Sequence, residues 1–190
     1  MALSLVTPPA VEPVTLQEAK DHLRVAGGGD DALISELIVA AREMAEAATW
    51  RALITQTWDW MLDDFRGLAR GVPKAPLQSV TSITYIDGAG AAQVLDAAAY
   101  QVDAVSQPGR IVPAYGTSWP AARAEINAVT VRIVAGYGLT GAAVTRTIRQ
   151  GTLLALTDLY ENRQSEIVGA AVSRFTQTAE KLWFLERVWH

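Results

Sequence analysis

Residues 31–65, DALISELIVAAREMAEAATWRALITQTWDWMLDDF, contain the change of hydrophobic period that decides the fold. In the first half, apolar residues recur at helical spacing and form one stripe, made by Leu33, Ile34, Leu37, Ile38, Ala41, Met44, Ala45 and Ala48. From Leu53 to Phe65, polar and aromatic residues alternate and β-branched residues are frequent. The sequence therefore predicts an amphipathic helix to about Thr49, followed by a strand.

A second helix is predicted on the N-terminal side of this stretch. Residues 15–18, TLQE, form a capping box, in which the Thr15 hydroxyl accepts from a free backbone amide and Glu18 reaches back to the cap residue. The glycines of residues 27–29 end this helix, which begins at Thr15 and runs to about Arg24. Asp30 or Asp31 can then cap the next helix.

Short strands are predicted on the C-terminal side of the stretch. The turn Asp87-Gly88 between two β-type runs is a typical hairpin signal. The runs that favour strands are 79–86, the residues around 92–95, 100–105, 110–112 and 128–135. The middle of the chain is thus expected to be an antiparallel β unit.

Helical spacing returns after Gly141 and continues to about Asn162. Residues 164–175 show only a weak, extended pattern, and 178–190 favour a short helix. We therefore expect an α+β fold with two N-terminal helices and one long helix in the C-terminal half, divided into helical residues 1–50, a β insertion at 51–141, and a helix and tail at 142–190. A single framework requires Leu37 and Ile148 to share one core.

Composition excludes several classes of function. The chain has 190 residues, a formal net charge of -4, no cysteine and two histidines, which leaves little for a metal site and no basic stripe for nucleic acid. The start of the chain has no basic region before an apolar run, so we expect no signal peptide, and no segment is long enough to cross a membrane. We expect synthesis in the cytoplasm and no cofactor.

One motif favours an enzyme. Gly136, Gly138 and Gly141 form G-x-G-x-x-G between a predicted strand and a predicted helix, as in dinucleotide-binding proteins. However, no second parallel strand ending in an acidic residue follows clearly, and the preceding strands resemble hairpins. A glycine-rich turn is the favoured interpretation; a nucleotide-binding enzyme remains the alternative.

Other side chains do not form a convincing catalytic set. Asp63 and Asp64 are neighbours on a strand and so point to opposite faces. The six tryptophans are compatible with a small ligand-binding domain, a further alternative, although Trp50, Trp58, Trp60 and Trp119 are expected to fill a core.

The C-terminal aromatic and aliphatic residues are the candidate partner-binding group. They are Leu182, Trp183, Phe184, Leu185 and Trp189. The residues before them carry little apolar area, so we expect 166–190 to be mobile in the free protein and to become ordered against a neighbouring subunit or another partner protein. The alternative is a helix packed on its own chain.

The order of motifs along the chain resembles the head-to-tail connector, or adaptor, proteins of tailed bacteriophages and gene transfer agents. These motifs are PVTLQEAKDHLRV at 13–25, Asp30-Asp31, the helix 33–48, RALITQTW at 51–58, PLQSV at 76–80, PGRI at 108–111, Trp119-Pro120, Gly136-Tyr137-Gly138 and YENR at 160–163.

The resemblance implies a structural protein and not an enzyme. It implies a ring of twelve copies between the portal protein and a stopper or tail-completion protein, with DNA passing through the lumen without sequence-specific binding. It further implies assembly in the host cytoplasm and a final location in the head-tail neck of a virion or gene transfer agent particle. We expect the free protein to be a monomer or weak oligomer, since no long coiled-coil seam is present.

Overall fold

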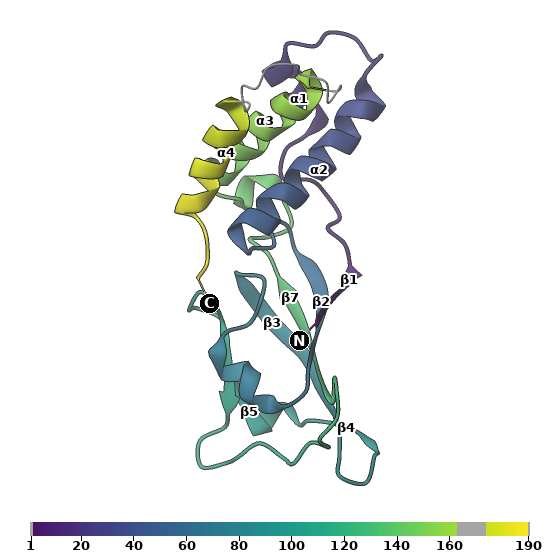
Figure 1. Cartoon of the computed structure of the whole chain (residues 1–190), viewed down its shortest axis with the longest axis vertical. Helices are drawn as coiled ribbons and strands as arrows, with labels where there is room; N and C mark the ends of the chain where they lie inside the picture. The colour runs from purple at the N-terminus through teal and green to yellow at the C-terminus, as the bar shows by residue number, and fades with distance from the viewer. Residues whose placement is uncertain (1, 163–173, 190) are drawn as a thin grey trace. The chain divides into compact units, whose positions relative to one another are not determined.

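The computed structural model describes residues 2–162 and 174–189, and the chain forms two compact units. The helical unit contains Ala10–Ile54 and Tyr137–Arg187, and the β unit contains Met1–Pro9, Thr55–Gly136 and Val188–His190. The chain therefore enters and leaves each unit more than once (Figure 1). No helix among the described residues has the length and apolar character that a membrane span requires.

The helical unit contains α1 (Leu16–Leu23), α2 (Asp31–Thr49), α3 (Arg146–Glu161) and α4 (Arg174–Leu185), and a short 3-10 helix η3 (Gly141–Ala143) before α3. The capping box is present, with Thr15 accepting from the Glu18 amide and Glu18 accepting from the Thr15 amide. Leu37 packs against the core cluster that contains Ile148. The predicted α+β fold with a single helical framework is confirmed.

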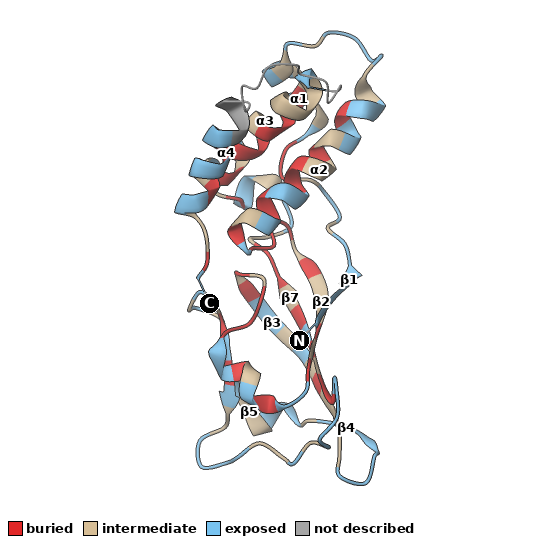
Figure 2. Cartoon of the chain, in the orientation of Figure 1, coloured by how far each residue is buried: buried red, intermediate tan, exposed pale blue. Residues whose placement is uncertain are grey.

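Small residues bring these helices close together. Figure 2 shows buried residues on the facing sides of α2 and α3. Gly151 of α3 is where α4 approaches, because a Cβ there would lie 2.4 Å from the Trp183 indole nitrogen. Ala155 and Ala179 are likewise buried, at 1% and 0% exposure. The large indole of Trp183 thus fits only because its neighbours are small.

The β unit contains a five-stranded sheet in the order β1-β2-β7-β3-β4, in which each neighbouring pair is antiparallel. Its strands are β1 (Ala2–Thr7), β2 (Gln56–Leu62), β3 (Leu77–Ile86), β4 (Ala92–Val94) and β7 (Val129–Ala135). The turn at Asp87 joins β3 to β4, as the hairpin signal predicted: the Asp87 carboxylate accepts from the Ala89 and Ala91 amides. Figure 1 shows β2, β7 and β3 side by side.

Aromatic side chains fill the core of the β unit. Trp60 is 1% exposed, and Phe65 stacks on Trp119 with ring centroids 5.0 Å apart. A small sheet made by β5 (Tyr100–Asp103) and β6 (Arg110–Pro113) and the 3-10 helices η1 (Phe65–Arg70) and η2 (Ala97–Ala99) complete the unit.

Three features differ from the expectations. Strand β1 was not predicted, since the prolines after it masked its alternation. Helix α4 begins at Arg174 and ends at Leu185, earlier than expected, while most of the weak region 164–175 lies outside the described residues. Trp50 is 46% exposed and does not fill a core; it ends α2 with a left-handed backbone at φ 61°.

Candidate functional site

Local packing explains each glycine of the G-x-G-x-x-G motif. Gly136 follows β7 at φ 135°, where an L side chain would be strained. A Cβ on Gly138 would lie 3.0 Å from the Ala143 Cβ, and one on Gly141 would lie 2.4 Å from the Pro13 carbonyl oxygen. The motif is therefore a tight turn that passes closely over the segment before α1.

The surroundings of this turn do not fit a dinucleotide. Both neighbours of β7 are antiparallel to it, whereas the fingerprint belongs to a parallel strand-helix-strand unit. Helix α3 begins at Arg146, five positions after Gly141, so the last glycine does not open the helix. The glycine motif therefore lacks the parallel strand-helix-strand unit that the nucleotide-binding alternative requires.

The buried charges of the helical unit serve its folding. Arg42 is 6% and Glu46 5% exposed, and the guanidinium donates to Glu46 at 3.0 Å and to Glu12 at 2.8 Å. Glu46 also accepts from the Leu53 amide at 2.8 Å. Burial raises the pKa of Glu12, although Arg42 partly opposes the shift. Both Glu46 oxygens have donors, so the cluster fixes the end of α2 rather than presenting a reactive group.

A broad concavity of about 530 Å³ lies in the β unit, beside Asp63, Asp64 and residues 122–126. Arg66 and Arg123 line it together with carboxylates, and it is open to solvent. Small-molecule sites are usually apolar and more enclosed, so this concavity gives the ligand-binding alternative little support. Within the described part of the chain, no group of three or more histidine or acidic residues is arranged to hold a metal ion.

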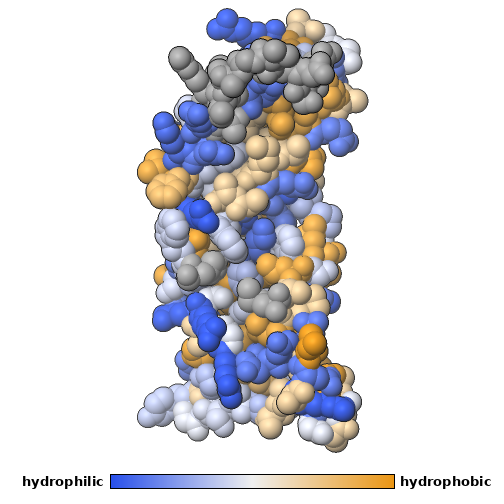
Figure 3. Space-filling model, in the orientation of Figure 1, coloured by the Kyte–Doolittle hydropathy of each residue, from blue (hydrophilic) through white to orange (hydrophobic). Residues whose placement is uncertain are grey.

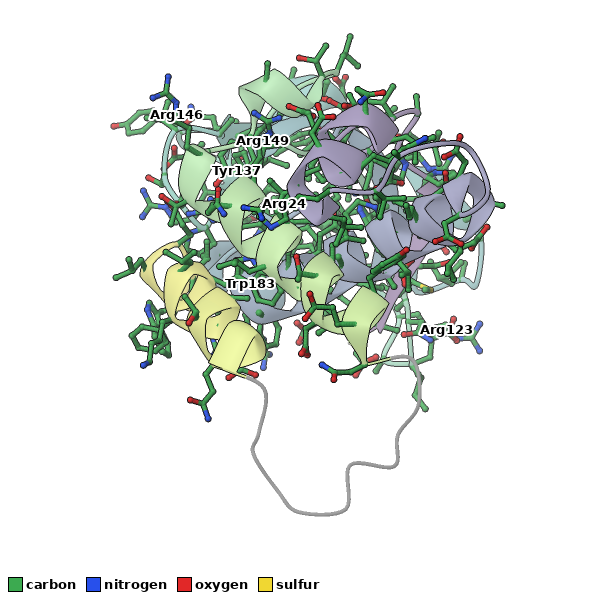
Figure 4. The ribbon with its side chains drawn as sticks, turned by 90° about the horizontal axis from the view of Figure 1, so that it is seen from above. Arg24, Arg123, Tyr137, Arg146, Arg149 and Trp183 are labelled. Atoms are coloured by element: carbon green, nitrogen blue, oxygen red, sulfur yellow. The ribbon has the colours of Figure 1, made fainter. Side chains whose placement is uncertain are left out.

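The five C-terminal candidates have different environments. Trp183 does not lie on a surface: it is 2% exposed and its indole reaches the Ile148 carbonyl at 3.4 Å. Figure 4 shows Trp183 between α4 and α3. Leu182 is half-buried, whereas Phe184, Leu185 and Trp189 are 58%, 75% and 64% exposed. The accessible candidates are thus Phe184 and Leu185 in the helical unit and Trp189 in the β unit, and the buried indole holds α4 in place.

The sequence analysis missed one surface, the outer edge of β1. All six residues of this strand are exposed, and among the strands that the structure describes β1 pairs with β2 alone. The alternation of Leu3 and Leu5 with Ser4 was the available signal. Pro8 and Pro9 follow immediately and limit the strand to residues 2–7.

Comparisons with known proteins agree on one type of protein. Residues 13–87 match the family model described as phage gp6-like head-tail connector protein. No curated protein matches the chain.

Solved structures match over almost the whole length. A chain in the neck of an empty GTA particle computed with C6 symmetry is 26% identical, with a TM-score of 0.77, covering 100% of this chain and 97% of that one. A chain in the virion of a native gene transfer agent particle is 26% identical, with a TM-score of 0.78 and the same coverage. A chain in the neck of a native GTA particle computed with C12 symmetry is 25% identical, with a TM-score of 0.75 and again the same coverage.

The family model spans α1, α2 and the first strands that follow them, and the structural matches extend the likeness through α3 and α4. The resemblance found in the motifs is therefore confirmed: residues 13–87 match the phage gp6-like head-tail connector family, and the whole chain is similar in fold to chains of gene transfer agent necks and virions.

Proposed function

We propose that this protein is a structural adaptor in the neck of a phage-like particle, where copies of it form a ring between the portal and the stopper or tail components. The observation that carries the proposal is the match, over 100% of this chain, to chains in necks computed with C6 and C12 symmetry. The similarity of fold over the whole chain supports the same kind of assembly for this protein.

The charge of the protein is consistent with DNA passing through such a ring. The formal net charge of -4 provides no general attraction for phosphates, and weak attraction between the protein and DNA favours sliding of DNA through a ring. We propose twelve copies in the ring, with no sequence-specific contact to the DNA, assembled in the host cytoplasm and then retained in the particle.

The exposed residues after Trp183 are the proposed contact with a neighbouring protein. Phe184, Leu185 and Trp189 are each more than half exposed, and aromatic residues of this kind commonly anchor protein interfaces. Leu182 and Trp183 support the group from the helical unit itself. We propose the portal protein as the partner of these residues.

Electron microscopy of purified particles tests the proposal. Particles from cells that produce the protein should contain a ring of this chain at the head-tail joint, and cells lacking its gene should accumulate heads without attached tails. Particles of normal composition and DNA content formed without the protein would show that it is not the adaptor.

A further inference from the structure

The five-stranded sheet has two uncharged stretches of open edge. One is β1, Ala2–Thr7, whose six residues are all exposed and include no charged side chain. The other is the first part of β3, because β4 pairs with Thr84–Ile86 only. Among the described strands, none pairs with the outer side of Gln78–Ser82, which also carries no charge, whereas Leu77 is buried and lies against Gly109.

Such edges are usually protected in folded proteins, because their free amides and carbonyls can pair with another chain. The small sheet of the same unit shows this protection, with the ion pair Asp103–Arg110 at 2.8 Å and a proline in β6. Strand β1 instead presents Leu3, Leu5 and Val6 at 37%, 44% and 42% exposure. Hydrophobic and hydrophilic residues are otherwise interspersed on the face shown in Figure 3.

The pairing across the sheet places the two open stretches at the same level. Ser4 pairs with Asp59, Asp59 with Arg132, and Arg132 with Ser82. By the same steps, Thr7 is level with Ser79 through Thr57 and Val134. Residues 4–7 of β1, on one edge of the sheet, are therefore in register with residues 79–82 of β3, on the other edge.

The strand directions also match. Each of the steps from β1 to β2, β2 to β7 and β7 to β3 is antiparallel, so β1 and β3 run in opposite directions. A neighbouring copy related by rotation about an axis along the strands would bring its β1 beside this part of β3, as an antiparallel strand above β4. Each copy would then use two different surfaces, as closed rings require.

We propose that β1 of one copy adds to the open edge of β3 in the next copy, so that one continuous sheet runs around the ring. This inference rests on the ring assembly proposed above. Bulges at Gln78 and Thr81, where the pairing of β3 with β7 shifts, shorten the regular stretch. The contact therefore supplies few backbone hydrogen bonds, and its main effect is to set the register between copies.

Cysteine cross-linking tests the proposal, because the chain contains no cysteine. The variant Ser4→Cys/Ser82→Cys is introduced into cells that produce the particles, and purified particles are oxidised mildly and denatured without reductant. Within one chain the two positions are separated by β2 and β7, about 14 Å at the usual strand spacing, which is too far for a disulfide. Cross-links can form only between copies.

The double variant should give a ladder of covalent oligomers that ends at the ring size. The single variants should give no species beyond a dimer, and Ser4→Cys/Val105→Cys, which uses a loop valine that is 92% exposed, should give no ladder. In particles of the unchanged protein, the amides of residues 2–7 should exchange at least tenfold more slowly than in the free protein.

Two possible results distinguish failure of the edge-to-edge contact from failure of the adaptor function. If the chain is present in a neck ring but its β1 amides exchange as fast as in the free protein, the edge-to-edge contact is wrong and the adaptor function stands. If the unchanged chain is absent from the particles, the adaptor function itself fails, and this inference fails with it.

Discussion

The helical unit and the β unit fill their cores with side chains of different size. In the helical unit, Gly151 and several alanines let the helices approach, and one indole, Trp183, occupies the space between α3 and α4. In the β unit, large rings such as Trp60 and Phe65 fill the core beneath a ladder of backbone hydrogen bonds. The helical unit is closed by tight packing, whereas among the described strands β1 and the first part of β3 each have one side without a paired strand.

The largest expected effect is the difference in stability between alanine variants of Trp183 and Trp189. Replacing the buried indole in Trp183→Ala leaves a cavity between α3 and α4, and we expect the free energy of unfolding to fall by about 4 kcal/mol. Trp189 is 64% exposed, so Trp189→Ala should cost less than about 1 kcal/mol. Urea unfolding of both variants measures the difference, and equal losses would contradict the assignment of only one of them to a core.

Arg42 tests the buried charges of the helical unit. Arg42→Met leaves the Glu46 carboxylate, whose side chain is 6% exposed, without its cation, and we expect a loss of about 3 kcal/mol. The matched control is Arg66→Met in the β unit, where the side chain is 90% exposed and the change should cost less than about 0.5 kcal/mol. Denaturant unfolding gives both values; an unchanged midpoint for Arg42→Met would show that the cluster does not stabilise the unit.

The capping box gives a smaller effect. Thr15→Ala removes the hydroxyl that accepts from the Glu18 amide, and we expect a loss of about 1 kcal/mol. Thr15→Ser keeps the hydroxyl, and we expect it to change the free energy of unfolding by roughly 0.3 kcal/mol. Thermal unfolding followed by circular dichroism compares the two. A loss as large for serine as for alanine would point to the methyl group rather than to the cap.

The smallest effect is a difference in acid sensitivity. In the β unit, the hydrogen bond from Arg132 lowers the pKa of Asp59, and the backbone amide of Ala91 lowers the pKa of Asp87. A lowered pKa stabilises the fold above the unfolded value, near 4, and this contribution is lost as the pH falls through the folded pKa. In the helical unit, the pKa of Glu18 is lowered and that of Glu12 is raised. The stability lost at Glu18 as the pH falls is therefore offset by stability gained at Glu12.

We therefore expect the β unit to lose more stability than the helical unit between about pH 5 and pH 3. Amide hydrogen exchange, corrected for the intrinsic pH dependence, compares β2 and β7 with α2 and α3. Asp59→Asn should reduce the difference. Larger acid losses in the helices would reverse the expected order.

The elements with strong periodicity could be predicted from sequence. Helix α2, the capping box of α1 and the Asp87-Gly88 turn each reflect local chemistry, and each lies where the sequence predicted it. The predicted stripe of α2 is correct only in part, because Leu33 and Met44 are each 37% exposed whereas Arg42 and Glu46 are buried. Strand β1 has only the short alternation of Leu3, Ser4 and Leu5 as a local signal, and its stability comes mainly from pairing with β2, some fifty residues later in the chain. The burial of Trp183 depends on the absence of a side chain at Gly151, which is a fact of tertiary packing.

The division of the chain between the units also sets the order in which they can fold on the ribosome. All strands of the five-stranded sheet have been synthesised once Ala135 is made, so pairing can begin while the rest is still being translated. The core of the helical unit needs α3, against which α2 packs, and is completed by Ala179 and Trp183 of α4, so the apolar stripe of α2 stays largely uncovered until α3 emerges. A nascent chain halted after β7 would therefore expose α2 to chaperones, although its sheet is already complete.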